Sequence, residues 1–323
     1  MMKIAYLGAR HHDGGNSVYH LLRQGLEPRG YEIHCVSNGS RAAQWVKERG
    51  WSSNDHVVAP CTEDARERTE ALVRFLQDYR FDVVVADPHA DEVGSNAMRF
   101  LPVSVRRICI VHTITYGAYA PTRAVLPWMD MCVGVSDRIR TDLTSRFALP
   151  AAAVRTIYHG VPVERLAIKR DCRKDGPLRL LSLGRVSDYS KGVMWLPGIM
   201  RRVVARSPGT RLTIVGDGPD RCRLESAFAK KGLASFVDFT GRVPLEEVAA
   251  QVTSHDVFLM PSRFEGCGIA LLEAMAAGCV PIASLIKGVT ERIVLQGESG
   301  FLCPVGATKA FADAVLRLDR DRD

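Results

Sequence analysis

Short runs rich in Val, Ile and Leu alternate along this chain with longer stretches in which apolar residues recur every three or four positions. The short runs predict buried strands, and the longer stretches predict amphipathic helices. Because strands and helices alternate, the chain is expected to form β–α–β units with parallel sheets covered by helices on both faces. In the first half we predict strands at Lys3–Gly8, Tyr31–Ser37, His56–Pro60, Phe81–Ala86, Arg107–His112, Cys132–Ser136 and Val154–Tyr158. The helices between them are predicted at Ser17–Pro28, Arg41–Gly50, Thr62–Tyr79, Glu92–Phe100, Thr122–Trp128 and Asp137–Phe147.

The second half shows the same alternation of predicted strands and helices, after a charged stretch that contains Pro and Gly, Val163–Pro177. Its strands are predicted at Leu178–Leu183, Arg211–Val215, Val237–Phe239, Val257–Met260, Val280–Ala283 and Gly300–Cys303. Its helices are predicted at Gly192–Arg206, Asp220–Lys231, Leu245–Val252, Ile269–Ala277, Val289–Leu295 and Thr308–Leu318. We therefore expect two doubly wound, Rossmann-like α/β domains, 1–163 and 178–323, joined by a linker at 164–177 and facing each other across a cleft. Ligands of such folds bind at the carboxyl ends of the strands.

Composition fits this picture and narrows the class of protein. With 323 residues, 46% of them apolar and 24% charged, the chain can bury two cores and is typical of a soluble globular protein. Its 43 Lys and Arg residues exceed its 36 Asp and Glu residues by 7, so the surface is mildly basic. No run of Lys or Arg has aromatic residues interleaved, which argues against a nucleic-acid partner. Peripheral contact with an anionic membrane surface and a homodimer are both left open.

Cysteine usage and hydropathy predict a cytoplasmic protein, with a position at the inner membrane face left open. The nine cysteines are odd in number and include no C-x-x-C pair, which indicates a reducing compartment. The N-terminus leads directly into a strand without a signal sequence. Ile269–Ile286 carries a single charge, but Gly278 and Pro281 interrupt it. We read it as a core helix, a turn and a core strand, and not as a membrane span.

The richest candidate site follows the strand Val257–Met260. Gly266 and Gly268 allow the backbone to approach a ligand, and a helix predicted to start near Gly268 directs unpaired N–H groups at it. Two carboxylates, Glu265 and Glu273, flank this anion site. A bound phosphate would repel them, so we expect them to accept hydrogen bonds from hydroxyl groups at the two ends of the ligand. A sugar, a diphosphate and a ribose in a row would satisfy this pattern.

Two cations precede this segment. Gly184-Arg185 ends a strand, and Lys191-Gly192 follows at a predicted helix start, which together suggest a diphosphate clamp; a solvated loop is the alternative. The next strand ends in Gly216-Asp217-Gly218-Pro219. A dinucleotide fingerprint would need a third glycine where Arg221 stands, so a nicotinamide site is rejected.

Taken in order, these motifs resemble the nucleotide-sugar domain of the family 4 glycosyltransferases, which have the GT-B fold and retain the anomeric configuration of the donor. The family's pair of glutamates separated by seven residues is matched by Glu265 and Glu273. The resemblance implies that Glu265 meets the donor hexose, that Glu273 meets the ribose, and that Arg185 and Lys191 hold the diphosphate. It also implies donor contacts from Gly184, Gly216, Gly218, Gly266, Cys267, Gly268 and Ile269. The full series is Gly184-Arg185, Lys191-Gly192, Gly216-Asp217-Gly218-Pro219, Gly241-Arg242-Val243, Pro261-Ser262, Glu265-Gly266-Cys267-Gly268, Glu273-Ala274-Met275-Ala276, Gly288-x-x-Glu291 and Gly297-x-x-Gly300.

The first half carries weaker signals. Gly14 and Gly15 are similar to the family's glycine-rich turn near the donor phosphate. His112 ends a strand, where the family has a His beside the donor sugar; a histidine with its hydrogen bonds satisfied at a strand end is an equal alternative. Adjacent histidines do not converge on one ion as i, i+4 pairs do, so no metal is expected. The acceptor-side candidates are His11, His12, Asp13 and His89, with a plain polar loop as the alternative for the first three.

Three departures from the family pattern qualify this reading. Cys267 stands where a bulky residue is usual, and Lys287 stands where a glycine is usual. Family members also continue further and end in a helix that crosses back to the first domain, which is expected to be missing from 1–323.

The sequence therefore predicts a glycosyltransferase that uses a UDP- or GDP-sugar as co-substrate, an unidentified acceptor, and no cofactor or metal. Arg185, Lys191, Glu265 and His112 are its predicted catalytic residues. The resemblance implies that the departing phosphate takes the acceptor proton, with the two cations stabilising its charge. Another GT-B enzyme, such as a nucleotide-sugar epimerase or a phosphorylase, and a catalytically silent nucleotide-sugar-binding subunit are the alternatives.

Overall fold

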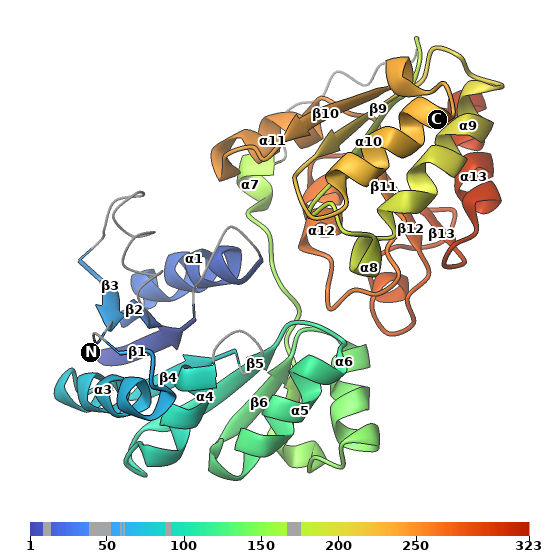
Figure 1. Ribbon diagram of the computed structural model, residues 1–323. Coiled ribbons are helices and arrows are strands. Elements are labelled where there is room, and N and C mark those ends of the chain that lie inside the picture. The colour runs from blue at the N-terminus through green and yellow to red at the C-terminus, as the bar shows by residue number, and fades with distance from the viewer. Residues whose placement is uncertain are drawn as a thin grey trace. The chain divides into compact units, whose positions relative to one another are not determined.

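The computed structural model describes residues 1–8, 14–38, 53–58, 60, 62–87, 92–166 and 176–322. The chain divides into two compact units, Met1–His159 and Gly160–Asp323, and each unit is a parallel sheet with its helices (Figure 1). The prediction of two parallel-sheet α/β domains is confirmed. The division lies at Gly160, and the first residues of the predicted linker form a short helix, α7 (Val163–Leu166), whose Leu166 is buried in the core of the second unit.

The sheet of the first unit has seven parallel strands in the order β3-β2-β1-β4-β5-β6-β7. Within the described residues they are β1 (Met2–Leu7), β2 (Tyr31–Asn38), β3 (Asp55–Val58), β4 (Val83–Ala86), β5 (Arg106–Val111), β6 (Met131–Gly134) and β7 (Val154–Thr156). The α-helices are α1 (Gly14–Leu26), α3 (Ala65–Asp78), α4 (Glu92–Ala97), α5 (Tyr116–Val125) and α6 (Asp137–Thr141). Shorter turns are η1 (Glu27–Arg29), η2 (Met98–Phe100), η3 (Leu126–Trp128), η4 (Asp142–Arg146) and η5 (Ala151–Ala153).

The described residues of the second unit form six parallel strands in the doubly wound order β10-β9-β8-β11-β12-β13. They are β8 (Arg179–Leu183), β9 (Arg211–Val215), β10 (Val237–Gly241), β11 (Val257–Met260), β12 (Val280–Ser284) and β13 (Phe301–Cys303). After α7, the helices are α8 (Asp188–Lys191), α9 (Leu196–Val204), α10 (Arg221–Lys230), α11 (Leu245–Thr253), α12 (Ile269–Ala276) and α13 (Thr308–Arg320). The turns are η6 (Val193–Trp195), η7 (Ala234–Phe236) and η8 (Thr290–Arg292).

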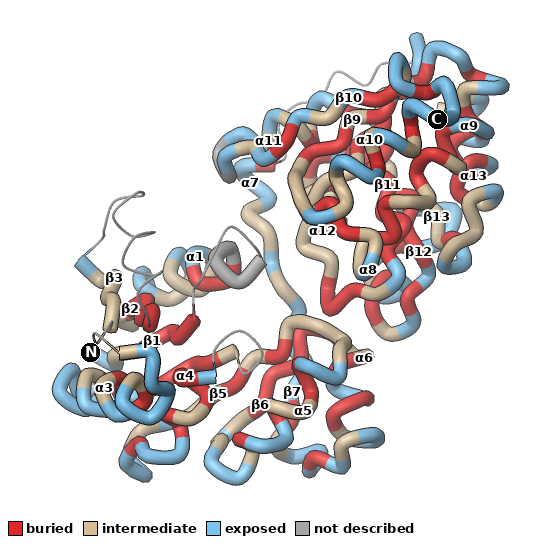
Figure 2. Tube along the Cα trace, in the orientation of Figure 1, coloured by how far each residue is buried: buried red, intermediate tan, exposed pale blue. Residues whose placement is uncertain are grey.

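Alternate residues of β8 and β11 are buried on opposite faces of the sheet. Leu180 packs with residues of α9 and α13, whereas its neighbour Leu181 packs with residues of α12. Val257 and Phe258 divide between the same two clusters. Figure 2 shows the buried residues following the strands, with the exposed ones on the outer faces of the helices. Each buried side chain of this size contributes about 1.5–3 kcal/mol, so the runs of apolar residues determine where the strands lie.

The long apolar stretch from Ile269 folds as helix α12, a turn at Gly278 and strand β12, as predicted. Throughout the described part of the chain, every helix is too short or too polar to cross a bilayer.

Several predicted helices differ from the observed ones. The helix predicted at Thr122–Trp128 begins earlier, at Tyr116, and continues through Pro121. The one predicted at Val289–Leu295 is only a 3-10 turn, η8, where the Thr290 hydroxyl accepts from the Ile286 N–H and donates to the Ser284 carbonyl oxygen. The helix predicted at Arg41–Gly50 lies outside the described residues.

Candidate functional site

The candidate site of the second unit lies at the carboxyl ends of β8 and β11. The chain order of the strands reverses between these two neighbours, and this is where doubly wound folds bind ligands. The loop after β8 carries Arg185 and leads through α8 to Lys191. The loop after β11 carries Ser262 and Glu265 and leads to α12. The sheet therefore brings together side chains that lie about 75 residues apart in the sequence.

Arg263 fastens the two loops to each other. Its backbone N–H donates to the Ser190 carbonyl at 2.8 Å. Its guanidinium donates to the carbonyl and carboxylate oxygens of Asp188 at 2.8 and 2.9 Å and lies 4.2 Å from the centroid of the Trp195 ring. Arg263 therefore contacts α8 through both its backbone and its side chain, and these contacts hold α8 beside β11.

Lys191, Glu265 and Ser262 form a compact charged cluster. Lys191 Nζ lies 2.6 Å from Glu265 Oε1, and Ser262 Oγ donates to the same carboxylate oxygen at 2.7 Å. The Glu265 residue is only 7% exposed, whereas the Lys191 side chain keeps 32% of its surface exposed. The ion pair thus compensates a buried carboxylate and leaves N–H donors of the ammonium group for a ligand.

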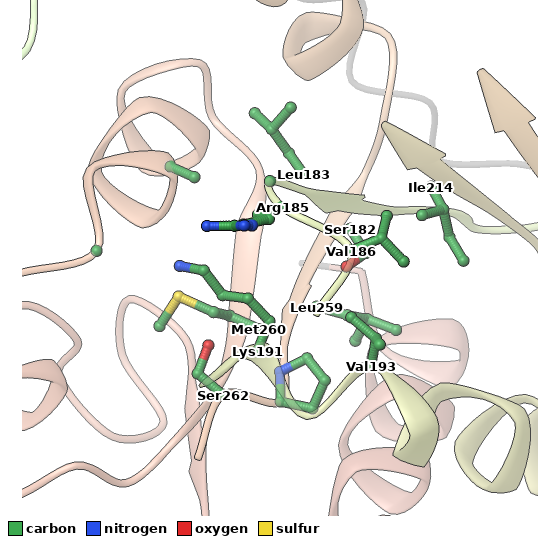
Figure 3. Close-up of a pocket in the computed structure, with 14 residues that line it drawn as sticks. Ser182, Leu183, Arg185, Val186, Lys191, Val193, Ile214, Leu259, Met260 and Ser262 are labelled. Atoms are coloured by element: carbon green, nitrogen blue, oxygen red, sulfur yellow. The ribbon is translucent and has the colours of Figure 1, made fainter. Parts of the chain in front are cut away.

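A small pocket that is partly open to solvent lies beside this cluster. Its lining includes Gly184, Arg185, Lys191, Ser262 and Gly268. Figure 3 shows the side chains of Arg185 and Lys191 projecting to the same side. Within the described part of the chain, no hydrogen bond or ion pair engages the Arg185 side chain, which leaves its guanidinium donors available. The pocket can therefore take an anion with several acceptor oxygens.

The helix N-terminus at this pocket belongs to α12. Gly268 is its N-cap residue in a left-handed conformation, and Ile269 begins the helix, as the sequence predicts. The first N–H groups of a helix are unpaired and favour negative charge.

The helix predicted from Gly192 begins as a 3-10 turn. Gly192 caps the C-terminal end of α8 at φ 60°, the turn η6 follows from Val193, and α9 begins at Leu196. A Cβ at Gly192 would lie 2.2 Å from the Pro261 carbonyl oxygen, so the glycine is required by the close approach of the two loops.

Glu273 lies one turn inside α12 and is a second carboxyl group of unusual chemistry. Burial raises its pKa from 4.5 to about 7. No hydrogen bond to its side chain is found among the described residues. This half-buried carboxyl can accept hydrogen bonds from ligand hydroxyls, which would favour its ionised form.

The other predicted donor residues of the second unit have various environments. Gly184 is open to the pocket, but Gly216 and Gly218 pack against the backbone of the β8 loop, where a Cβ would lie 2.0 and 2.3 Å from carbonyl oxygens. Packing alone accounts for these two glycines. Gly266 and Cys267 are buried in the β11 loop, and Lys287 is exposed after β12.

Predicted residues of the first unit are placed only in part. His112 follows β5, and its ring stacks on that of His159, with Nδ1 of His112 3.2 Å from Nε2 of His159. Gly14 and Gly15 form the first turn of α1. His11, His12, Asp13 and His89 lie outside the described residues.

Four residues that shape these sites were not predicted from the sequence: Ser262, Arg263, Asp188 and His159. Ser262 had a signal, because it lies three residues before Glu265 in the quoted motif. The Arg263–Asp188 contact joins residues 75 positions apart, and a single sequence carries no local trace of such a pair.

Comparison with known proteins agrees with this architecture. Residues 12–165 match the model described as Glycosyltransferase Family 4, and residues 177–321 match that of Glycosyl transferases group 1. The crystal structure of Anabaena Alr3699/HepE in complex with UDP and glucose superimposes with a TM-score of 0.80 at 17% identity, over 100% of this chain and 91% of that one.

Two curated relatives are similar in sequence. Glycogen synthase of Mycobacterium tuberculosis is 29% identical over 196 residues, 59% of this chain and 47% of that protein. A GDP-mannose-dependent alpha-(1-6)-phosphatidylinositol monomannoside mannosyltransferase of Mycolicibacterium smegmatis is 32% identical over 237 residues, 67% of this chain and 56% of that protein. The chain thus spans about half the length of these relatives. With both halves matched and the fold shared, the chain belongs to the family 4 glycosyltransferases and has their GT-B fold.

Proposed function

We propose that this protein is a glycosyltransferase that moves a sugar from a nucleoside-diphosphate sugar to an acceptor with retention of the anomeric configuration. The observation that carries the proposal is the pocket at β8 and β11, where two cations and a helix N-terminus lie beside a buried carboxylate. A diphosphate needs the cations and the helix N-terminus, and a sugar hydroxyl needs the carboxylate. Few ligands other than a nucleotide-sugar offer both groups side by side.

In this proposal each charged residue binds one part of the donor. The guanidinium of Arg185 binds diphosphate oxygens in a bidentate manner, and the remaining N–H donors of Lys191 bind a further oxygen. Glu265 accepts a hydrogen bond from a hexose hydroxyl, and Glu273 accepts those of the ribose. Backbone N–H groups of Gly266–Ile269 complete the phosphate and sugar contacts.

Catalysis would then consist of positioning and charge stabilisation. The bond from the anomeric carbon to the diphosphate oxygen breaks, and the acceptor oxygen bonds to that carbon on the same face. The departing phosphate oxygen takes the acceptor proton, while Arg185 and Lys191 stabilise the negative charge it gains. Neither a metal nor another cofactor has a role in this scheme. The acceptor is proposed to bind mainly to the first unit.

UDP- and GDP-sugars are the donors that we propose, because a structural neighbour was crystallised with UDP and glucose and a relative is named as GDP-mannose-dependent. A panel of UDP, GDP, ADP, TDP and their common sugars tests this by thermal shift. A true donor at a hundredfold excess over its dissociation constant stabilises the protein by about 2.7 kcal/mol. Stabilisation by none of these compounds would contradict the proposal. The anomeric proton coupling of the first product, followed by NMR, tests retention.

The raised pKa of Glu273 predicts that both stability and donor affinity depend on pH. Its pKa in the folded protein is raised by burial to about 7, so the protonated form stabilises the fold. That contribution is fully present below the unfolded value of 4.5 and is lost as the pH rises through about 7. Ribose hydroxyls donate to the ionised form, so donor affinity should rise between about pH 6 and pH 8, and binding near pH 6.5 should release a proton.

Calorimetric titration of a nucleoside-diphosphate sugar in two buffers of different ionisation enthalpy measures this proton release. The matched variant is Glu273→Gln, which keeps the size of the side chain and cannot ionise. It should bind without proton release and with little dependence on pH. Equal proton release by the variant and the wild type would show that Glu273 is not the linked group.

A further inference from the structure

Two neighbouring loops at the amino edge of the first unit's sheet expose large apolar side chains. One loop leads from η2 into β5 and the other leads from η3 into β6, and these parallel strands are neighbours in the sheet. Phe100 and Val103 belong to the first loop and keep 63% and 93% of their surface exposed, and Trp128 of the second keeps 36%. We call these three residues the apolar patch. Val103 is the most exposed of the large apolar residues that the structure describes.

A single arginine joins the two loops. The Arg107 guanidinium donates to the carbonyl oxygens of Leu101 and Pro102 at 2.6 and 2.8 Å, and to that of Trp128 at 3.2 Å. The Arg107 backbone N–H also donates to the Asp130 carboxylate at 2.8 Å, at the end of the second loop. Because these hydrogen bonds hold both loops in place, a partner that binds the apolar patch need not order them first.

The apolar patch is surrounded by positive charge. The segments 99–107 and 123–130 together carry four arginines and one aspartate, which gives them a net charge of +3. The aspartate, Asp130, already accepts a hydrogen bond from the Arg106 guanidinium at 2.9 Å. The surface that a partner meets is therefore apolar at its centre and cationic around it. Exposed apolar patches with a polar rim mark sites that bind a protein or a membrane.

Charge decides between these partners. A second copy of the chain would bring the same net positive charge against its own, which opposes association. The headgroups of an anionic bilayer attract that charge, and the apolar side chains can enter the boundary between headgroups and acyl chains. The Arg99 guanidinium lies 4.6 Å from the centroid of the Trp128 ring. Such a pair places a cation and an amphipathic ring together, and both groups favour the interface between a membrane and water.

We propose that the amino edge of the first unit docks on a membrane surface that contains anionic phospholipids. Phe100, Val103 and Trp128 enter the headgroup region, and the arginines around them bind lipid phosphates. Doubly wound folds bind ligands at the carboxyl edge of the sheet, which lies at the other ends of the strands, so docking leaves that edge accessible. The inference does not depend on the proposed function, because it rests on the surface of the first unit alone.

Flotation of the full chain with lipid vesicles measures the docking. One set of vesicles contains equal parts of phosphatidylcholine and phosphatidylglycerol, and the other contains phosphatidylcholine alone. We expect the protein to bind the anionic vesicles at about 0.05 M NaCl. Its affinity should be at least about tenfold weaker for the neutral vesicles, and for the anionic ones at about 0.5 M NaCl, because salt screens the attraction.

Two double variants separate the apolar contribution from the electrostatic one. Phe100→Ser with Val103→Ser removes two apolar side chains and should weaken binding to anionic vesicles by about tenfold or more at either salt concentration. Arg99→Gln with Arg106→Gln removes two cations and should weaken binding by about tenfold at low salt, with a much smaller effect at high salt.

Matched controls make the same substitutions away from the apolar patch. Leu295→Ser replaces an apolar residue of the second unit that is 59% exposed, and Arg66→Gln replaces an exposed arginine on α3. Neither control should change vesicle binding. Melting temperatures verify that every variant is folded, and each should keep the response of the wild type to nucleotide-sugars in the absence of lipid.

Quenching of tryptophan fluorescence by brominated phosphatidylcholine, mixed with phosphatidylglycerol, shows which surface enters the bilayer. The chain has four tryptophans, so the contribution of Trp128 is the part of the quenching that Trp128→Phe loses. We expect this substitution to remove most of the quenching while binding is largely kept, because the phenylalanine ring still enters the headgroup region. Unchanged quenching in Trp128→Phe would show that another surface lies on the membrane.

Other outcomes would also overturn the proposal. These are equal affinity for anionic and neutral vesicles, no binding of the wild type to either, and unchanged binding by either double variant. Analytical ultracentrifugation without lipid tests the other occupant. A dimer that dissociates in the variant with Phe100→Ser and Val103→Ser would assign the apolar patch to a second copy of the chain, and would contradict docking on lipid.

Discussion

Lys191→Ala is expected to lower turnover by about a hundredfold to a thousandfold, the range for removing one donor that stabilises charge developing on a leaving group. It should also lower stability, because the variant leaves Glu265 buried with Ser262 as its one remaining hydrogen-bond partner among the described residues. The Lys191 side chain is 32% exposed, so this cost is about 1–2 kcal/mol and not that of a fully buried pair. Steady-state kinetics and thermal unfolding measure the two effects separately.

Three further variants separate the roles of Lys191. Arg185→Ala should lose turnover on a similar scale with an unchanged melting temperature, because the exposed Arg185 side chain makes no hydrogen bond or ion pair with the described part of the chain. Adding Glu265→Gln to Lys191→Ala removes the unpaired carboxylate, so stability should recover while turnover stays low. Lys309→Ala breaks an exposed ion pair of 2.8 Å on α13 and should change neither. Near-normal turnover by Lys191→Ala would show that the lysine is structural.

Gly192→Ala is expected to cost at least about 3 kcal/mol of stability. Gly192 adopts φ 60°, which a residue with a Cβ disfavours, and the added Cβ would lie 2.2 Å from the Pro261 carbonyl oxygen. The backbone of the β11 loop would have to move, and Ser262 and Glu265 move with it. Donor affinity should therefore fall together with stability, as calorimetry and chemical unfolding can measure.

Gly232→Ala is the matched control for Gly192→Ala. Gly232 has a similar φ of 67°, but a Cβ there meets nothing within 4 Å. Gly232→Ala should therefore lose only the stability that backbone strain costs, about 1–2 kcal/mol, because its Cβ collides with no neighbouring loop. It should leave donor affinity unchanged. If the two variants lost the same stability, the close approach of the β8 and β11 loops would not be a determinant of the site.

The parallel sheets could be predicted from the sequence because strand position depends on local patterns. Val257–Met260 is apolar at every position, and the strand found there has the predicted bounds. The α12 N-terminus was also predictable, since Gly268 follows two other loop signals, Gly266 and Glu265. Such features are encoded by neighbouring residues, whose conformational preferences and burial do not depend on the rest of the fold.

The remaining features depend on tertiary contacts. Lys191-Gly192 fits both a helix start and a helix end, and in the structure Gly192 ends α8 and precedes the turn η6, with the Pro261 carbonyl oxygen close to it. The contact of Arg263 with Asp188 requires that β8 and β11 be neighbours, although β9 and β10 lie between them in sequence. The pairing of His112 with His159 likewise depends on the order β5-β6-β7.

Calorimetric titration with the best nucleoside-diphosphate sugar of the panel tests the central claim, that the pocket at β8 and β11 binds the donor. We expect one site in the wild type, an affinity at least about tenfold weaker in Arg185→Ala, and an unchanged affinity in Lys309→Ala. Equal affinity in the wild type and in Arg185→Ala, or no binding of any nucleoside-diphosphate sugar by the wild type, would contradict it.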